Sequence, residues 1–171
     1  MSDTVEKMEF PGSPRPTEVS VQLVPHCDSS AQPSIGEVVE RKLKEGRILK
    51  IGRQVMRDGQ PVMRGNKVLL EDDIWFVSKV VSRIHAELWT KEGVVYIKDI
   101  GSSSGTFLNK MRLSPSGKES RPYPLKQGDV VQLGIDYKGK PDDIYKSVSV
   151  KVMFHDQDWI KASRNAANHV K

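Results

Sequence analysis

Four short segments hold the polar and glycine residues with the clearest chemical potential. They are Gly52-Arg53, Ser82-Arg83-Ile84-His85, the run from Asp99 to Asn109 (DIGSSSGTFLN) and the run from Leu125 to Gly134 (LKQGDVVQLG). Each falls at the end of an expected strand or in a connecting loop, where a rigid sheet holds binding groups in place. We expect the first three segments to lie at one rim of the fold.

The residue types in these segments match the needs of a phosphate ester. Such a group carries about −1.5 to −2 charges near neutral pH and three strong acceptor oxygens, so it is bound by guanidinium groups, hydroxyls and backbone N–H groups. Arg53 and Arg83 supply the guanidinium groups and Ser82 the hydroxyl, beside the serine-rich loop. The pattern predicts a phosphate-binding edge.

A catalytic interpretation of the same residues is the first alternative. Ser82 with His85 could be a nucleophile and its base, with Asp99 as the orienting acid. However, Ser82 lies in no strand-turn-helix elbow of the kind that presents a catalytic serine. We therefore predict no catalytic residues and no enzyme activity in this chain.

Composition narrows the remaining classes of function. The net charge of +5 favours acidic partners, which leaves nucleic acid, an anionic membrane and phosphoproteins open. Aromatic residues make up only 6% of the sequence, and basic and aromatic residues do not alternate along it. Since single-stranded nucleic acids bind to such alternating residues, we expect no nucleic-acid partner. There is one cysteine, Cys27, and the four histidines do not cluster, so we expect no metal site and no cofactor. We also expect no membrane contact.

The chain is expected to fold as an all-β, two-sheet antiparallel β-sandwich over residues 39–156. Residues 1–38 are rich in proline and polar residues and predict a flexible tail, and 157–171 predict a short C-terminal helix or linker. Trp89 is expected in the core, and Ala86, Leu88, Val95 and Ile97 are expected to face inward. The expected strands are Arg47–Ile51, Lys67–Leu70, His85–Trp89, Val94–Lys98, Thr106–Leu108, Val130–Leu133 and Val148–Phe154.

In this order, the four segments resemble the forkhead-associated (FHA) domain family, over roughly Gly46 to Phe154. The resemblance implies an FHA/SMAD-like sandwich that binds phosphothreonine-containing proteins. It assigns the phosphate contacts to Arg53, Ser82 and Arg83, and makes His85 a structural residue that holds its loop.

The resemblance also assigns the peptide contacts and the supporting residues. Ser103 and Ser104 occupy the places where the family commonly has a threonine and an asparagine that touch the peptide. Serine at position 104 cannot supply the paired amide donor and acceptor of asparagine. The implied supporting residues are Gly52, His85, Gly105, Thr106 and Asn109. Lys79 and the basic residues of the 110–126 loop either select residues after the phosphothreonine or are plain solvated charges.

Within the family, the sequence looks most like fungal FHA-RING ubiquitin ligases of mitotic checkpoint control. A RING needs about eight Cys and His ligands, so a RING is absent here and residues 157–171 would lead to it. This likeness implies a partner-targeting role in the cytoplasm or nucleus, at the spindle pole or division site. A stand-alone adaptor is the alternative, and a homodimer through the tail or the binding groove remains open.

Overall fold

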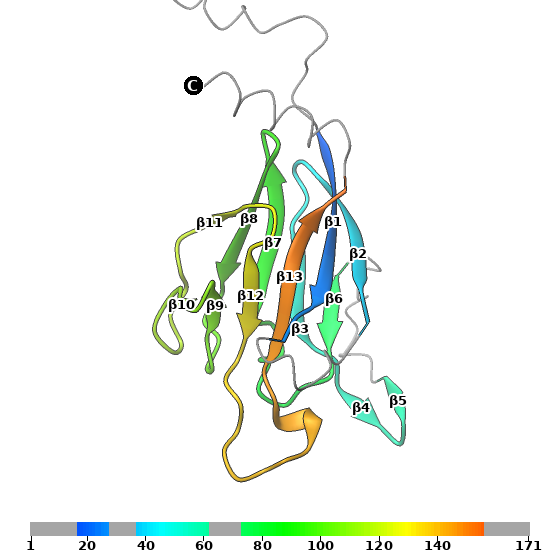
Figure 1. Ribbon diagram of the computed structural model, residues 1–171, viewed down its shortest axis with the longest axis vertical. Coiled ribbons are helices and arrows are strands. Elements are labelled where there is room, and N and C mark those ends of the chain that lie inside the picture. Colours follow the sequence, from blue (N-terminus) through cyan, green and yellow to red (C-terminus); the bar gives the residue numbers. More distant parts are fainter. Residues whose placement is uncertain (1–16, 28–36, 62–72, 156–171) are drawn as a thin grey trace, which may run out of the picture.

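The computed structural model describes residues 17–27, 37–61 and 73–155, which form a sandwich of two β-sheets (Figure 1). The six-stranded sheet has the order β10-β9-β12-β13-β1-β2, the five-stranded sheet has the order β11-β8-β7-β3-β6, and β4 and β5 form a separate hairpin. The strands are β1 Glu18–Pro25, β2 Val39–Lys44, β3 Leu49–Arg53, β4 Met56–Arg57, β5 Gln60–Pro61, β6 Ile74–Phe76, β7 Ala86–Lys91, β8 Val94–Asp99, β9 Thr106–Leu108, β10 Met111–Arg112, β11 Tyr123–Leu125, β12 Val130–Leu133 and β13 Val148–Phe154. A single turn of 3-10 helix, η1 (Asp143–Tyr145), precedes β13.

The predicted all-β sandwich is confirmed, with one difference in strand direction. Strand β6 pairs with β3 in parallel, whereas the other paired strands of the described residues run antiparallel. The five-stranded sheet is therefore mixed. The expected strand at 67–70 and the expected helix at 157–171 lie outside the described residues, and the helix is not confirmed.

Strand β1 corrects the prediction of a flexible tail over residues 1–38. It pairs with β13 on one side and with β2 on the other, and so lies inside the six-stranded sheet. Its residues Val19, Val21 and Leu23 are buried because they alternate with polar or edge positions, which turns one face to the core. The folded domain therefore begins by Glu18, about 20 residues before the predicted boundary.

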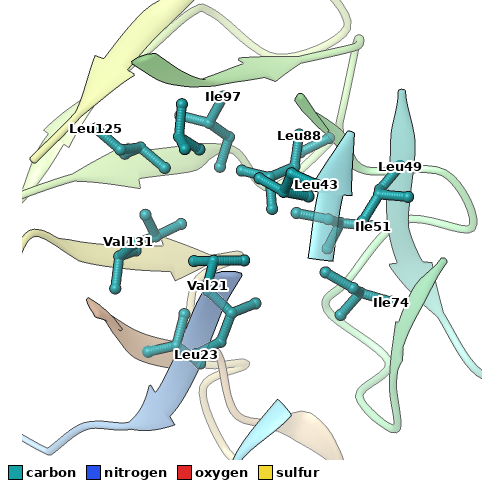
Figure 2. Packing of buried hydrophobic residues seen from close by; sticks show 14 of the residues in the cluster. Val21, Leu23, Leu43, Leu49, Ile51, Ile74, Leu88, Ile97, Leu125 and Val131 are labelled. Atoms are coloured by element: carbon teal, nitrogen blue, oxygen red, sulfur yellow. The ribbon is translucent and has the colours of Figure 1, made fainter. Parts of the chain in front are cut away.

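The core lies between the two sheets (Figure 2). Val21, Leu23 and Val131 come from the six-stranded sheet and face residues of the five-stranded sheet. The β7–β8 hairpin shows how the sequence specifies this packing, since its alternate residues are at most 1% exposed, as predicted: Ala86, Leu88, Val95 and Ile97. Burying each large apolar side chain stabilises the fold by about 1.5–3 kcal/mol, so the strand register is strongly fixed.

Trp89 is not part of this core, contrary to its predicted place. Its neighbours Leu88 and Thr90 are buried, so the alternation of the strand turns Trp89 to the outer face. There it stacks on Tyr96 of β8, with ring centroids 5.9 Å apart and an angle of 21° between the ring planes.

Strand direction brings several loops to one end of the sandwich, the lower end in Figure 1. Strands β3, β6, β8 and β12 finish there, and β7, β9 and β13 start there. The loops at this end are 77–85, 100–105 and 134–147. They hold most of the residues that the sequence predicts for phosphate binding.

Candidate phosphopeptide-binding site

Arg53 is the last residue of β3, and the glycine before it lets a second loop cross the strand. A Cβ atom on Gly52 would lie 2.0 Å from the Arg83 carbonyl oxygen and 2.8 Å from the Trp75 ring, so only glycine fits. The Arg53 N–H then donates to the carbonyls of Ser82, at 3.0 Å, and Arg83, at 3.3 Å. The structure thus brings Arg53, Ser82 and Arg83 together, as predicted.

His85 connects the loop of Ser82 to the serine-rich loop. Its Nδ1 accepts the Ser82 N–H at 3.0 Å, and its Nε2–H donates to the Gly105 carbonyl at 2.8 Å. The ring is fully buried, and burial lowers the pKa of His85 below its ordinary value of 6.5, although the bond to Gly105 and the charge of Asp99 act in the opposite direction. The neutral ring is therefore a brace between the two loops.

This geometry does not support a Ser82–His85 catalytic pair. Both ring nitrogens of His85 are engaged by backbone groups, and the bond to Ser82 involves its backbone N–H and not its hydroxyl. A general base must reach the hydroxyl proton that it removes. His85 instead holds the loop through these two backbone contacts.

Asp99 organises the serine-rich loop from inside. Its Oδ1 accepts the N–H groups of Gly101 and Ser102, both at 2.9 Å, and its Oδ2 accepts the hydroxyls of Ser102, at 2.5 Å, and Thr106, at 2.7 Å. Asp99, Ser102 and Thr106 are each at most 1% exposed. A buried carboxylate with four donors fixes the loop tightly, because charge-assisted hydrogen bonds are the stronger ones.

Ser103 and Ser104 lie at the outer part of that loop. Ser103 is exposed and Ser104 half-buried. The Ser82 hydroxyl oxygen accepts the Ser103 N–H at 3.3 Å and lies 3.5 Å from the Ser103 hydroxyl. Because the Ser82 oxygen accepts from this amide, its own proton can point toward a bound anion. Ser82 and Ser103 are thus brought together, with Ser104 next in the chain.

A further loop supports the serine-rich loop from its other side. The Ser116 hydroxyl donates to the Ser103 carbonyl at 2.8 Å, and the Gly117 N–H donates to the Ser102 carbonyl at 2.9 Å. The Arg112 guanidinium packs against the same loop at Gly105. Its Nε atom lies 2.9 Å from the position that a Cβ atom would take at residue 105. Sequence reasoning missed Ser116, because no local pattern shows which loops will meet.

The two ends of β9 separate the predicted supporting residues. Thr106 starts β9 and bonds Asp99, whereas Asn109 follows the strand at the opposite end. Asn109 donates to Asp129 at 3.0 Å and accepts the Val130 N–H at 2.9 Å, so it supports the turn before β12. It is therefore a brace of the sandwich and not of the rim.

Gly134, at the end of the LKQGDVVQLG segment, returns the chain to the rim. Its N–H donates to the Gly105 carbonyl at 2.8 Å, the same carbonyl that His85 contacts. Its φ of +81° and its close approach to the Val80 carbonyl both favour glycine. The fourth segment therefore contributes its last residue to the predicted site.

The rim as a whole offers the groups that an anion requires. Arg53 at the end of β3, Arg83 in the 77–85 loop, and the Ser82 and Ser103 hydroxyls belong to separate elements, which His85 and Asp99 hold together. Within 17–27, 37–61 and 73–155 there is no cluster of three or more His, Cys, Asp or Glu side chains arranged to bind a metal. In the same ranges, no helix is long and apolar enough to span a membrane.

Two curated fungal proteins are similar to this chain in sequence. The chain is 47% identical over 98 residues to the probable E3 ubiquitin-protein ligase dma1 of Schizosaccharomyces pombe, covering 57% of this chain and 37% of that protein. It is 38% identical over 148 residues to the E3 ubiquitin-protein ligase DMA2 of Saccharomyces cerevisiae, covering 84% of this chain and 28% of that protein. The chain thus spans about a third of the length of these curated relatives.

A solved structure shares the fold, and a family model identifies the domain. The solution structure of the FHA domain of an Arabidopsis thaliana hypothetical protein is 24% identical, with a TM-score of 0.51, over 81% of this chain and 87% of that one. The model of the FHA domain matches residues 49–134, which include β3, both site loops and the end of β12. The chain therefore belongs to the FHA domain family.

Proposed function

We propose that this chain binds phosphothreonine-containing proteins at the rim formed by the 77–85 and 100–105 loops. FHA domains are phosphothreonine-binding modules, and this chain belongs to that family. In the proposed complex Arg53, Ser82 and Arg83 hold the phosphate, and Ser103 and Ser104 contact the peptide. The observation that carries the proposal is the convergence of Arg53 and Ser82, from different elements, on one braced edge.

The expected affinity follows from the number of charged contacts. Each charge-assisted hydrogen bond contributes about 1.5–3 kcal/mol, and micromolar binding requires about 8 kcal/mol in total. Two or three such bonds to the phosphate, with backbone contacts along the peptide, reach this range. A reversible signalling contact of micromolar affinity is thus expected, with no turnover of the bound peptide.

Selectivity for phosphothreonine over phosphoserine is expected to depend on the extra methyl group. We place this methyl in a small pocket beside the serine-rich loop. One methyl group in an apolar pocket is worth about 1–3 kcal/mol, so phosphothreonine should bind roughly 10- to 200-fold more tightly.

Calorimetry with three matched peptides tests this proposal. The peptides differ only in carrying phosphothreonine, phosphoserine or unmodified threonine at one position. We expect heat of binding for the first, much weaker binding for the second and none for the third. Equal affinity for the two phosphopeptides would refute the methyl pocket, and equal affinity for all three would refute phosphate reading itself.

The cellular role that we propose is partner targeting for a RING-type ubiquitin ligase in cell-cycle control. Its support is the similarity to the two Dma ligases, of which this chain matches only a part. In this role the chain selects phosphorylated proteins at the spindle pole or division site, and the catalytic step belongs to a RING outside these residues. Proximity labelling in cells can compare the unmodified chain with Arg53→Ala. We expect the labelling of phosphorylated division-site proteins to be lost in the variant, and unchanged labelling would contradict this role.

A further inference from the structure

The 134–147 loop packs directly against the segment that leads into the phosphate-binding rim. The Lys79 N–H donates to the Ile144 carbonyl at 2.7 Å, and the Ser78 hydroxyl donates to another carbonyl of the same loop at 2.6 Å. The Lys79 carbonyl in turn accepts a long hydrogen bond, 3.4 Å, from the Arg53 guanidinium. The surface of this loop is therefore continuous with the proposed phosphate site, at the lower end of Figure 1.

Two lysines converge on one aromatic ring at this surface. The Lys79 ammonium lies 5.3 Å and the Lys140 ammonium 5.1 Å from the centroid of the Tyr145 ring, and the Tyr137 ring packs at 5.9 Å from the same ring. Among the described residues, no carboxylate lies within ion-pair distance of either lysine. Two cations thus contact one tyrosine ring.

Apolar side chains are exposed around the same lysines. Val77 is 54% exposed, Tyr137 58% and Ile144 37%, which are high values for residues of this size. Exposed apolar groups that gather beside cations mark an interaction surface more often than scattered single ones do. We name this surface the basic-aromatic patch, and it consists of Val77, Lys79, Tyr137, Lys140, Ile144 and Tyr145.

We propose that the basic-aromatic patch binds an acidic segment of the phosphorylated partner that also carries apolar residues and flanks the phosphothreonine. This inference rests on the proposed function and adds the chemistry of the flanking sequence to it. Aspartate or glutamate side chains of the partner pair with Lys79 and Lys140, and apolar residues between them cover Val77 and Ile144. Two observations favour this occupant. The lysines of the patch are complementary to acidic side chains, and Lys79 is hydrogen-bonded to Arg53 of the proposed phosphate site.

The presence of two lysine side chains on one ring supports an anionic occupant. Each exposed ion pair contributes only a modest amount, so two pairs should strengthen binding by about 3- to 10-fold. The gain should shrink as salt rises, because these charges are exposed.

Five phosphothreonine peptides of equal length test the inference by calorimetry. One has neutral, polar flanks, and two have an acidic and apolar flank either before or after the phosphothreonine. The last two repeat these flanks with the acidic residues replaced by their amides. We expect one of the two acidic-flank peptides to bind about 3- to 10-fold more tightly than its amide version and than the neutral peptide.

A double variant and a matched control assign the preference to the patch. Lys79→Ala with Lys140→Ala should bring the affinity ratio of acidic to neutral peptides close to one. Lys91→Ala with Lys151→Ala removes the same charge from exposed positions of β7 and β13 away from the rim, and should leave the ratio as in the unmodified chain. A ratio that survives the first double variant, or that both double variants reduce equally, would overturn the inference.

The outcomes separate this inference from the proposed function. Absence of binding for all five peptides would reject the proposed function, whereas tight phosphopeptide binding with no flank preference would reject only the role of the patch. Vesicles containing phosphatidylserine provide the other arm, because exposed apolar and basic side chains also suit an anionic membrane. Vesicle binding that Lys79→Ala with Lys140→Ala abolishes, without any peptide preference, would replace the partner segment with a lipid surface.

Discussion

Replacing His85 with alanine tests whether the braced loops are one cooperative unit. The ring is fully buried and joins the Ser82 N–H to the Gly105 carbonyl, through bonds of 3.0 and 2.8 Å. In the variant, the Ser82 N–H loses its acceptor, and the space of the ring becomes a cavity beneath the rim. Gly105 is less affected, because its carbonyl keeps the N–H of Gly134.

The magnitude can be estimated from these contacts. An unsatisfied N–H costs about 1–3 kcal/mol, and the bond lost at Gly105 adds about 0.5–1.5 kcal/mol. With the cavity included, we expect His85→Ala to lower the free energy of unfolding by about 3–5 kcal/mol. This is a large part of the 5–15 kcal/mol that is typical of whole domains.

Urea denaturation followed by tryptophan fluorescence measures this loss, with His155→Ala as the control at an exposed histidine. At a temperature where the variant is folded, its affinity for a phosphothreonine peptide should also fall by about tenfold or more, because the Ser82 loop is no longer held. A loss of stability below about 1 kcal/mol would refute the view of His85 as a brace.

Three further predictions concern the same end of the sandwich. Because the pKa of His85 is lowered in the folded state, the unfolded state takes up the proton first as pH falls. The stability that is present above pH 6.5 should therefore be lost below it, by up to about 1.4 kcal/mol per pH unit. Urea titrations across this range should give a slope of unfolding free energy against pH that His85→Ala lacks, and equal slopes would contradict the assignment. Gly52→Ala should cost about 2–4 kcal/mol in thermal denaturation, since its Cβ would meet the Arg83 carbonyl, and an unchanged melting temperature would contradict that contact. Asp99→Ala should cost about 3–5 kcal/mol, because Ser102 loses its acceptors inside the fold, and a variant as stable as the parent in chemical denaturation would contradict this role.

Local patterns were sufficient to predict the hairpin of β7 and β8. Residues Leu88 and Ile97, on either side of the turn at Gly93, alternate with neighbours that are less buried, and both are buried as expected. Alternation of this kind depends only on the pleat of a strand, so it can be recognised without knowing the partner strand. The ability of Arg53 and Ser82 to bind an anion could also be predicted, because it depends on residue type and not on the fold.

Strand β1 shows where composition misleads. Prolines and polar residues dominate the first 38 positions, and this overall composition predicts a flexible segment. The alternating apolar residues Val19, Val21 and Leu23 within it nevertheless form a strand. Whether such a short run forms a strand depends on the edges of β2 and β13, which lie far away in the chain. The predicted core position of Trp89 was wrong, because Leu88 and Thr90 take the inward positions of β7 and leave residue 89 on the outer face.

Contacts between loops could not be predicted for a related reason. Ser116 supports Ser103 across 13 positions of sequence, and Lys79 of the 77–85 loop contacts Tyr145 of the 134–147 loop. Such pairs follow from the stacking of two sheets, which brings together loops that share no local pattern. The basic-aromatic patch therefore became visible only in the folded chain.

Calorimetry of Arg53→Ala with a phosphothreonine peptide tests the central claim most directly. The removed guanidinium should cost at least one charge-assisted hydrogen bond, a loss of about 10- to 150-fold in affinity. The control Lys91→Ala, which removes one exposed charge at the end of β7 away from the rim, should bind as the parent does. Undiminished binding by Arg53→Ala, or an equal loss in both variants, would show that the phosphate is not held at this rim.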